Sequence, residues 1–233
     1  MSTSQVKTLF HEFGHALARL FARGPYPQVT GSYPKDMVEL PSQLMEHWAW
    51  QPEVMKNYTS HYQTGKPMPR DLIDRIRENR SALKGTALLS SYFTMLLDLE
   101  LHGITEPMTP EGVEALTAEL RERYGIPAAI PITDPTVLNH IFDGPYGAQY
   151  YAYAWASVLD TDAFAAFTET GDPFDKAVAE RFRRHILTQI GYDKPARQYV
   201  RFRGRMPGPE ALMERYGLTL PAEGSATTGD AAE

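Results

Sequence analysis

The segment LFHEFGHAL, at residues 9–17, carries two histidines four residues apart, with a glutamate directly after the first. On a helix, side chains at this spacing share one face, so His11 and His15 can present their rings to a single metal ion. Glu12 projects about 100° round the helix from His11, where it can reach a water molecule held by that ion. A helix is expected because apolar residues recur at spacings of three and four: Leu9, Phe10, Phe13, Leu17, Leu20 and Phe21.

Two neutral imidazoles on one face suit zinc, which binds histidine nitrogen and keeps an open position in catalytic sites. Zinc lowers the pKa of a bound water molecule to about 7, so that water becomes a nucleophile near neutral pH. Glu12 is then the candidate general base, as in H-E-x-x-H metalloproteases. A five-residue pattern also arises by chance, and the pattern alone leaves open a purely structural helix with two histidines.

A catalytic zinc site needs a third protein ligand. His47 and several carboxylates are candidates, and Glu39, within KDMVELPSQLMEHW, is the most suggestive. The preceding loop is rich in glycine and proline, which can end one helix and return the chain so that a second helix crosses the first. The residues allow another role, in which Asp36 caps this helix and Glu39 completes a capping-box-like arrangement. Pro41 adds ambiguity, because proline suits only the first turn of a helix.

Four separated motifs, in order, resemble the thimet oligopeptidase family of zinc peptidases, which includes oligopeptidase A and the bacterial peptidyl-dipeptidase. They are HEFGHAL, TGSYPKDMVELPSQLMEHWAW, HIFDGPYGAQYYAYAW and FRGRMPGPEALMERYGL, and the resemblance runs from about Thr8 to Leu218. It implies one zinc ion as cofactor, with His11, His15 and Glu39 as the metal ligands. It also implies that Glu12 is the general base.

Glu46 lies on the same predicted helical face as Glu39. Histidines that bind a metal nearly always donate their other N–H group, so Glu46 could accept that hydrogen bond from a ligand histidine. A surface carboxylate is the equal alternative. Asp36 is a weaker candidate for the same role, and His47 is interpreted as structural.

Tyr146, Tyr150 and Tyr153 are spaced as one helical stripe, which is typical of a packing surface. A positioned phenol can instead stabilise the oxyanion formed in peptide hydrolysis. The family resemblance favours the second role: it implies that His140, Tyr146 and Tyr153 act in transition-state and substrate binding, and that Tyr150 is a further substrate contact. We assign oxyanion and carbonyl contacts to Tyr153 and Tyr146, and contact with the substrate backbone to His140.

This sequence departs from the family pattern at two places. Gly144 and Gly147 flank Tyr146, so the loop could close over a peptide, but Asp143 and Pro145 stand where the family loop is more uniformly glycine and should stiffen it. Ala18 replaces a histidine that is common in relatives. That position is not among the ligands, so we expect little effect on zinc.

The expected fold is mainly α, a zincin-like helical catalytic domain with at most a short β-hairpin between the first two helices, at 25–33. Later helices are predicted over 70–84, over 86–102, over 109–125 with a cap at Thr109 and a stop at Gly125, from Pro173 toward Ile190, and within 208–218. Residues 1–220 are expected to form the metallopeptidase domain, and the small, polar residues 221–233 a disordered tail.

Composition narrows the function classes. The 233 residues suffice for one large domain, and the net charge of −6 gives no basic footprint for nucleic acid. No apolar run approaches the roughly 18 residues of a membrane span, and no signal-peptide pattern is present. Cysteine is absent, so thiol chemistry is excluded. A cytoplasmic protein with no membrane partner is expected.

The first functional hypothesis is zinc-dependent hydrolysis of short peptides, as an oligopeptidase or a peptidyl-dipeptidase. In the family a long helical region precedes the H-E-F-G-H helix and forms one wall of the substrate channel, whereas about ten residues precede His11 here. The chain could be a fragment, a truncated gene product or half of a split enzyme. The alternative hypothesis is a non-catalytic zinc- or peptide-binding remnant that needs a missing N-terminal half. Exposed apolar surface would favour binding of that half or self-association.

Overall fold

The computed structural model describes every residue except 25, 27, 29, 31–32, 80–83 and 220–233. Its secondary structure elements are helices. The described residues contain no β-strand, only an isolated antiparallel bridge between Ser60 and Pro67. The prediction of a mainly α fold is therefore confirmed. The hairpin expected at 25–33 falls largely on residues outside the described set, and so does the tail expected at 221–233.

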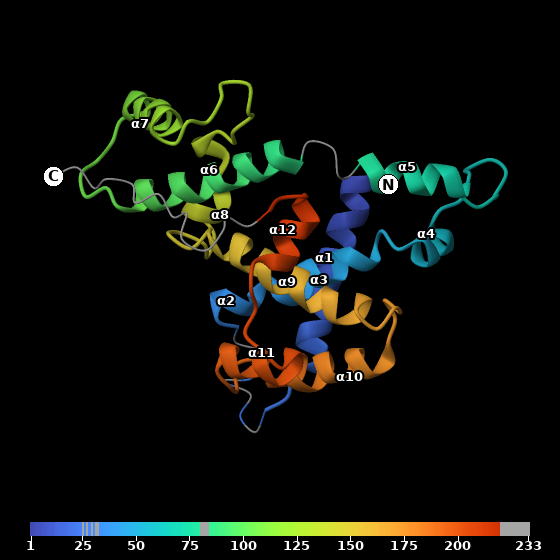
Figure 1. Cartoon of the computed structure of the whole chain (residues 1–233). Helices are drawn as coiled ribbons and strands as arrows, with labels where there is room; N and C mark the ends of the chain where they lie inside the picture. The colour runs from blue at the N-terminus through green and yellow to red at the C-terminus, as the bar shows by residue number, and fades with distance from the viewer. Residues whose placement is uncertain (25, 27, 29, 31–32, 80–83, 220–233) are drawn as a thin grey trace.

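The helices run in the order shown in Figure 1. They are α1 (Thr3–Phe21), α2 (Lys35–Val38), α3 (Leu40–Trp48), α4 (Pro52–Tyr58), α5 (Arg70–Asn79), α6 (Lys84–His102), α7 (Pro110–Arg123), η1 (Pro135–Val137), α8 (Asn139–Phe142), α9 (Ala152–Thr168), α10 (Lys176–His185), η2 (Leu187–Gln189), α11 (Pro195–Arg203) and α12 (Glu210–Tyr216). Among the described residues, none of these helices combines the length and apolar character needed to cross a bilayer.

Helix α1 begins at a capping box that the sequence analysis did not identify. Ser2 accepts a hydrogen bond from the backbone N–H of Gln5, and the Gln5 side chain accepts one from the backbone N–H of Ser2. The helix buries Gly14 and Ala18. Several members of the apolar stripe that predicted the helix remain exposed, namely Leu9, Phe13 and Leu20.

Helix α3 follows α2 after a break in the helical path at Glu39. Glu39 is the N-cap residue of α3 but its side chain makes no capping hydrogen bond, and Pro41 lies in the first turn of α3. Asp36 lies within the first turn of α2, whose N-cap residue is Pro34. The capping-box alternative for Asp36 and Glu39 is therefore wrong, and the Glu39 side chain is available for another role.

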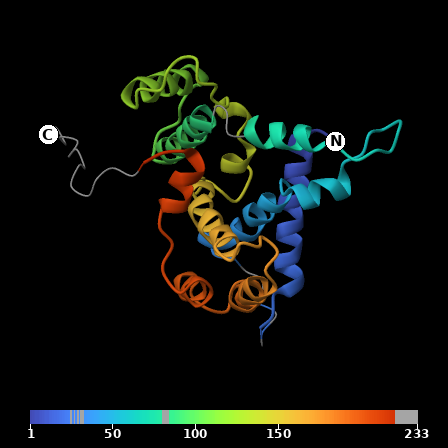
Figure 2. The ribbon, with the colours of Figure 1, turned by 45° about the vertical axis from the view of Figure 1, so that its right-hand side comes forward.

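The buried apolar residues form two hydrophobic clusters, and α2 and α3 belong to the larger one. The larger one joins α1, α2, α3, α9, α10, η2 and α11, and its buried members include Leu40, Leu44, Leu159, Phe167, Ile186 and Tyr199. The smaller one joins α6, α7 and α8 through Phe93, Leu97, Leu120, Leu138 and Ile141. Figures 1 and 2 show α6 and α7 at one end of the molecule and α10 and α11 at the other, with α3 and α9 between them. Tyr150, in the segment between α8 and α9, packs against the smaller cluster, and that segment leads into α9, which contributes to the larger one.

The predicted helix boundaries are correct where capping residues mark them. Thr109 caps α7 by accepting from the N–H of Gly112, and Gly125 follows the helix with a positive φ of 61°. The predicted helix start at Pro173 is wrong. Helix α10 begins at Lys176, because the Asp175 side chain caps it by accepting from the N–H of Val178. Residues 80–83 of the helix predicted over 70–84 lie outside the described set.

Candidate metal centre

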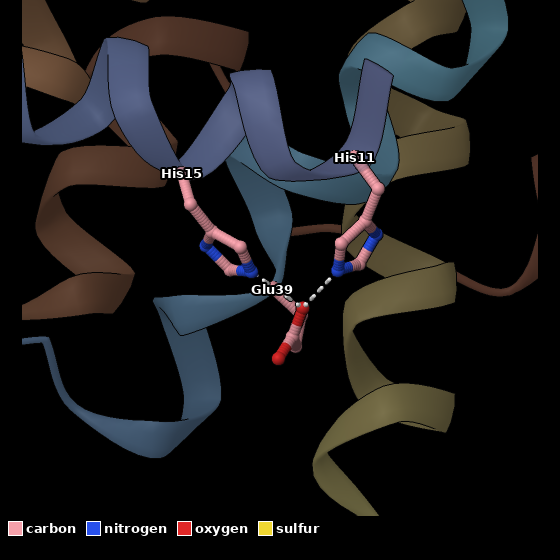
Figure 3. A group of neighbouring side chains, drawn as sticks. All are labelled: His11, His15 and Glu39. Atoms are coloured by element: carbon pink, nitrogen blue, oxygen red, sulfur yellow. Dashed lines mark ion pairs between the residues drawn. The ribbon is translucent and has the colours of Figure 1, made fainter. Parts of the chain in front are cut away.

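The side chains of His11, His15 and Glu39 meet at one point between α1 and the start of α3 (Figure 3). Oε2 of Glu39 lies 3.2 Å from Nε2 of His11 and 3.4 Å from Nε2 of His15. The two imidazoles are edge to face, with ring centroids 5.0 Å apart. The structure thus brings together the two histidines predicted from local spacing and the glutamate that was the most suggestive third ligand and that the family resemblance also implied.

The spacing of these three atoms fits a small tetrahedral cation. Zinc binds nitrogen and carboxylate oxygen at about 2.0–2.2 Å, so two ligand atoms at tetrahedral positions are separated by roughly 3.3–3.5 Å. The two nitrogen–oxygen separations are close to this range, since one is 3.4 Å and the other, at 3.2 Å, is slightly shorter. A set of two histidines and one glutamate also has the donor chemistry of a catalytic rather than a structural zinc site. The residues therefore fit zinc.

Gly14 allows the two helices to approach closely enough for this arrangement. It lies on α1 between His11 and His15, and a Cβ atom there would lie 2.5 Å from the backbone oxygen of Pro41 and 2.5 Å from Cα of Ser42. Such a distance is far inside van der Waals contact, so any other residue would push α1 away from α3. Because Glu39 stands at the start of α3, the helix separation sets its distance from the two imidazoles.

Glu39 is held by neighbours as well as by the two histidines. It is 2% exposed. The Ser42 hydroxyl lies 2.9 Å from its Oε2 atom, and the Tyr146 hydroxyl donates to its Oε1 atom. Burial alone would raise the pKa of Glu39, but hydrogen bonds from the two imidazoles, Tyr146 and Ser42 outweigh burial and hold that pKa far below its usual range. Glu39 therefore stays a carboxylate, as a metal ligand must be.

The second ring nitrogen of His11 has a carboxylate partner. Nδ1 of His11 lies 2.8 Å from Oε1 of Glu46, and the other Glu46 oxygen lies 3.2 Å from Nζ of Lys7. Glu46 is buried, which resolves the two roles left open for it in favour of a histidine partner. Hydrogen bonding of this kind fixes the ring and leaves Nε2 facing Glu39.

The same two carboxylates set the charge of His11 in the metal-free centre. Burial alone would lower the pKa of His11, but hydrogen bonds to Glu39 and Glu46 outweigh it and raise the pKa to about 9. His11 therefore carries a proton at neutral pH when no metal is bound. Binding of a cation at Nε2 must displace that proton.

The tyrosines lie beside Glu39, but they do not form the predicted helical stripe. Tyr153 belongs to α9, whereas Tyr146 and Tyr150 lie in successive turns that precede it. The rings are nevertheless neighbours, because the centroid of Tyr153 is 5.1 Å from that of Tyr146 and 5.1 Å from that of Tyr150. Burial, and after it the nearby carboxylates, raises the pKa of all three phenols. They therefore remain protonated and can act as hydrogen-bond donors.

Three further residues considered in the sequence analysis, His140, Glu12 and His47, are not among the three side chains that meet at the candidate metal centre. His140 is exposed on α8, with its ring centroid 6.0 Å from that of Tyr146. Glu12 is exposed on α1, directly after His11. His47 lies elsewhere, because its Nε2 atom is 2.6 Å from Oδ2 of Asp160 and its ring stacks on Phe164; this contact agrees with its structural interpretation.

Sequence reasoning missed three residues that hold the centre. The sequence could have indicated the role of Gly14, since glycine inside a helix costs about 1 kcal/mol relative to alanine and often marks a close approach between backbones. It indicated the role of Lys7 more weakly, because Lys7 precedes His11 by one helical turn and lies on the same face of the helix. Ser42 had none, since its hydroxyl contact with Glu39 depends on the break between α2 and α3.

Comparison with known proteins agrees with this geometry. The model of the family described as "Peptidase family M3" matches residues 1–218. The chain is 36% identical over 217 residues to oligopeptidase A of Salmonella typhimurium, which covers 92% of this chain and 32% of the relative. It is 39% identical over 228 residues to a probable cytosolic oligopeptidase A of Arabidopsis thaliana, in a match that covers 94% of this chain and 32% of the relative. It is 37% identical over 218 residues to dipeptidyl carboxypeptidase of Escherichia coli, in a match that covers 92% of this chain and 32% of the relative. The chain thus spans about a third of the length of these relatives.

Proposed function

The chain belongs to peptidase family M3, and from this membership we propose that it hydrolyses short peptides with one zinc ion held by His11, His15 and Glu39. The observation that carries the proposal is the convergence of these three side chains, whose ligand atoms all lie within 4.8 Å of one another. The names of the relatives, oligopeptidase and dipeptidyl carboxypeptidase, support peptides as the substrate class.

In this proposal zinc, when bound, supplies Lewis-acid polarisation of the scissile carbonyl and makes water acidic near neutral pH. Glu12 takes the proton from the attacking water and passes it to the leaving amine. Its exposed position on α1, next to a ligand, supports this role. Glu46 keeps the His11 ring oriented through the hydrogen bond at Nδ1.

The phenols supply hydrogen bonds to the reacting carbonyl. Tyr153 and Tyr146 donate to the oxygen on which negative charge develops, a contact that typically contributes about 10²–10³ in rate. Their raised pKa values support this role, because a neutral phenol keeps its proton for donation. His140 and Tyr150 hold the peptide on the same side. Tyr146 must release Glu39 Oε1, or share its proton, to reach the substrate.

We propose residues 1–220 as one catalytic domain, and the cytoplasm as its location, which the name of the Arabidopsis relative supports. The name dipeptidyl carboxypeptidase supports release of dipeptides from the C-terminus, and internal cleavage is the other mode considered. Mass spectrometry of the products from one defined peptide separates these two modes.

The direct test is turnover of a short peptide with a fluorophore and quencher at its ends. The chain loaded with zinc is compared with the Glu12→Gln variant, which keeps all three ligands. We expect measurable cleavage by the wild type and a loss of about 10²–10⁴-fold in the variant, the contribution typical of a general base. Equal background rates in both proteins, with zinc bound, would overturn the proposal in favour of a non-catalytic zinc-binding remnant.

A further inference from the structure

A buried carboxylate on α6, Asp98, lies outside the metal centre and is not used by the chemistry above. It is 0% exposed. Its carboxylate is near one imidazole, since Oδ1 lies 2.9 Å from Nδ1 of His102 one turn later on the same helix. A buried carboxylate is costly unless its oxygens are well satisfied, so the contacts of Asp98 need an explanation.

The contacts of Asp98 join α6 to the tyrosine loop, which we define as residues 143–151. The backbone N–H of Ala148 donates to Oδ1 of Asp98, and the backbone N–H of Tyr150 donates to Oδ2, each at 2.9 Å. The two oxygens of one side chain thus hold two alternate amides of this loop. Hydrogen bonds to a charged acceptor are stronger than neutral ones, and the carboxylate that accepts both of these is itself buried.

The loop conformation needs such support at Ala148. Its φ is 54°, in the left-handed region, and it is the one non-glycine residue with positive φ in the part of the chain that the structure describes. An L residue adopts this conformation at an energetic cost. The N–H of Ala148 is one of the two groups that Asp98 accepts from, so the carboxylate stabilises the loop at its strained position.

The His102 ring packs against the same loop. A Cβ atom at Gly147 would lie 2.8 Å from Nε2 of His102 and 3.0 Å from the backbone oxygen of Ile141. The ring also stacks on Phe142, with centroids 5.8 Å apart. Asp98 and His102 therefore both contact the backbone at 147–150 from α6, with Gly147 at the point of closest approach to the His102 ring.

We propose that Asp98 is a positioning residue for the substrate-facing tyrosines, an inference that rests on the proposed peptidase function. The two amides that it binds lie between Tyr146 and Tyr153, and one of them belongs to Tyr150. Tyr146 in turn touches Glu39, and its ring and that of Tyr150 both flank Tyr153. Asp98 sets where these phenols stand relative to the ligands without contacting the metal centre or the substrate.

The test compares zinc-loaded wild type with Asp98→Asn, which keeps the shape of the side chain but replaces one acceptor oxygen with a donor. Glu100→Gln is the matched control, because it removes a carboxylate from the same helix where that group pairs with Arg123 and not with the loop. Three quantities are measured for each protein: amide hydrogen exchange at Ala148 and Tyr150, the zinc dissociation constant, and kcat and KM for the quenched peptide.

We expect Asp98→Asn to speed exchange at both amides and to lower kcat about tenfold or more, with zinc affinity changed less than about threefold. Glu100→Gln should leave all three quantities near wild type. Unchanged exchange and unchanged kcat in Asp98→Asn would overturn the proposal, and so would a joint loss of zinc binding and of the cooperative unfolding transition, which would make Asp98 a residue of the core. If the wild type cleaves no peptide, the proposed function fails by itself, and faster exchange at the two amides then still supports loop positioning by Asp98.

Discussion

The hydroxyl of Tyr146 donates a hydrogen bond to Oε1 of Glu39, a residue 107 positions earlier in the chain. Oε2 of the same carboxylate faces the two imidazoles of α1. One glutamate therefore connects the two halves of the centre, the histidines that would hold a metal ion and the phenols that would contact the substrate. This connection links metal binding to the position of the tyrosines.

Tyr146→Phe removes that donor while preserving the ring and its packing. We expect kcat for the quenched peptide to fall by about 10²–10³-fold, the usual effect of losing a donor to a developing oxyanion. The measurement is steady-state kinetics at saturating zinc. Tyr62→Phe is the control, because Tyr62 is 86% exposed on the loop between α4 and α5. A kcat within about threefold of wild type would show that Tyr146 only supports Glu39.

Gly14→Ala tests the close approach of α1 and α3. The added methyl group would meet the backbone at Pro41 and Ser42, so we expect a loss of about 1–3 kcal/mol in the free energy of unfolding, as for other overpacked sites. Zinc affinity should fall as well, because Glu39 moves with α3. Chemical denaturation and zinc titration measure the two effects.

Gly85→Ala is the matched control for this substitution. Gly85 also lies in a helix, α6, but a Cβ atom there meets nothing within 4 Å. Alanine is the better helix former, so this variant should be as stable as wild type or more stable. If Gly14→Ala behaved in the same way, the packing account of the centre would be wrong.

Glu46→Ala leaves Nδ1 of His11 without its carboxylate partner. Loss of such a partner typically weakens metal binding by about 10–100-fold, because the ring is no longer fixed. We expect a weakening in this range, measured as the zinc dissociation constant. Asp36→Ala removes an exposed carboxylate from α2 and should leave the constant unchanged. Equal zinc dissociation constants for wild type and Glu46→Ala would show that Glu46 does not support metal binding.

The pH dependence of metal binding follows from the pKa of His11, which is raised to about 9 in the metal-free protein. Below that pH the His11 ring is in its protonated, charged form, and zinc must displace a proton from it to bind. We therefore expect zinc affinity to increase as pH rises from about 7 to about 9, by up to about tenfold per pH unit, and then to level off. The stabilisation that protonated His11 gives the metal-free fold is present below about pH 6.5 and is lost as pH rises through about 9. Zinc affinity independent of pH across this range would contradict the charge state assigned to His11.

The sequence predicted the parts of this centre that depend on local spacing. His11 and His15 follow from helical periodicity, and the bounds of α7 follow from its Thr109 cap. The residues made Glu39 a candidate ligand but left its capping role open, because its distance from α1 depends on the turn between α2 and α3 and on the approach at Gly14. The family resemblance favoured the ligand role. The tyrosine spacing predicted one helical stripe, but Tyr146 and Tyr150 lie in turns before α9, as the turn-forming residues Gly144, Pro145 and Gly147 favour.

The role of Asp98 could be predicted from the sequence only in part. It lies within the apolar run TMLLDLELH, and a charged residue in such a run is a signal of a buried polar contact. The partners of Asp98, the amides of Ala148 and Tyr150, are backbone groups that every residue except proline can offer. The sequence therefore marks the carboxylate but not the loop that it holds.

We expect His11, His15 and Glu39 to bind one zinc ion. Anomalous X-ray diffraction from crystals of the zinc-loaded chain, recorded on both sides of the zinc absorption edge, locates that ion. We expect one difference peak within about 2.2 Å of Nε2 of each histidine and of a Glu39 oxygen, and its absence from crystals of Glu39→Ala grown in the same way. A peak at another position, or a Glu39 side chain turned away from the ion, would contradict this expectation.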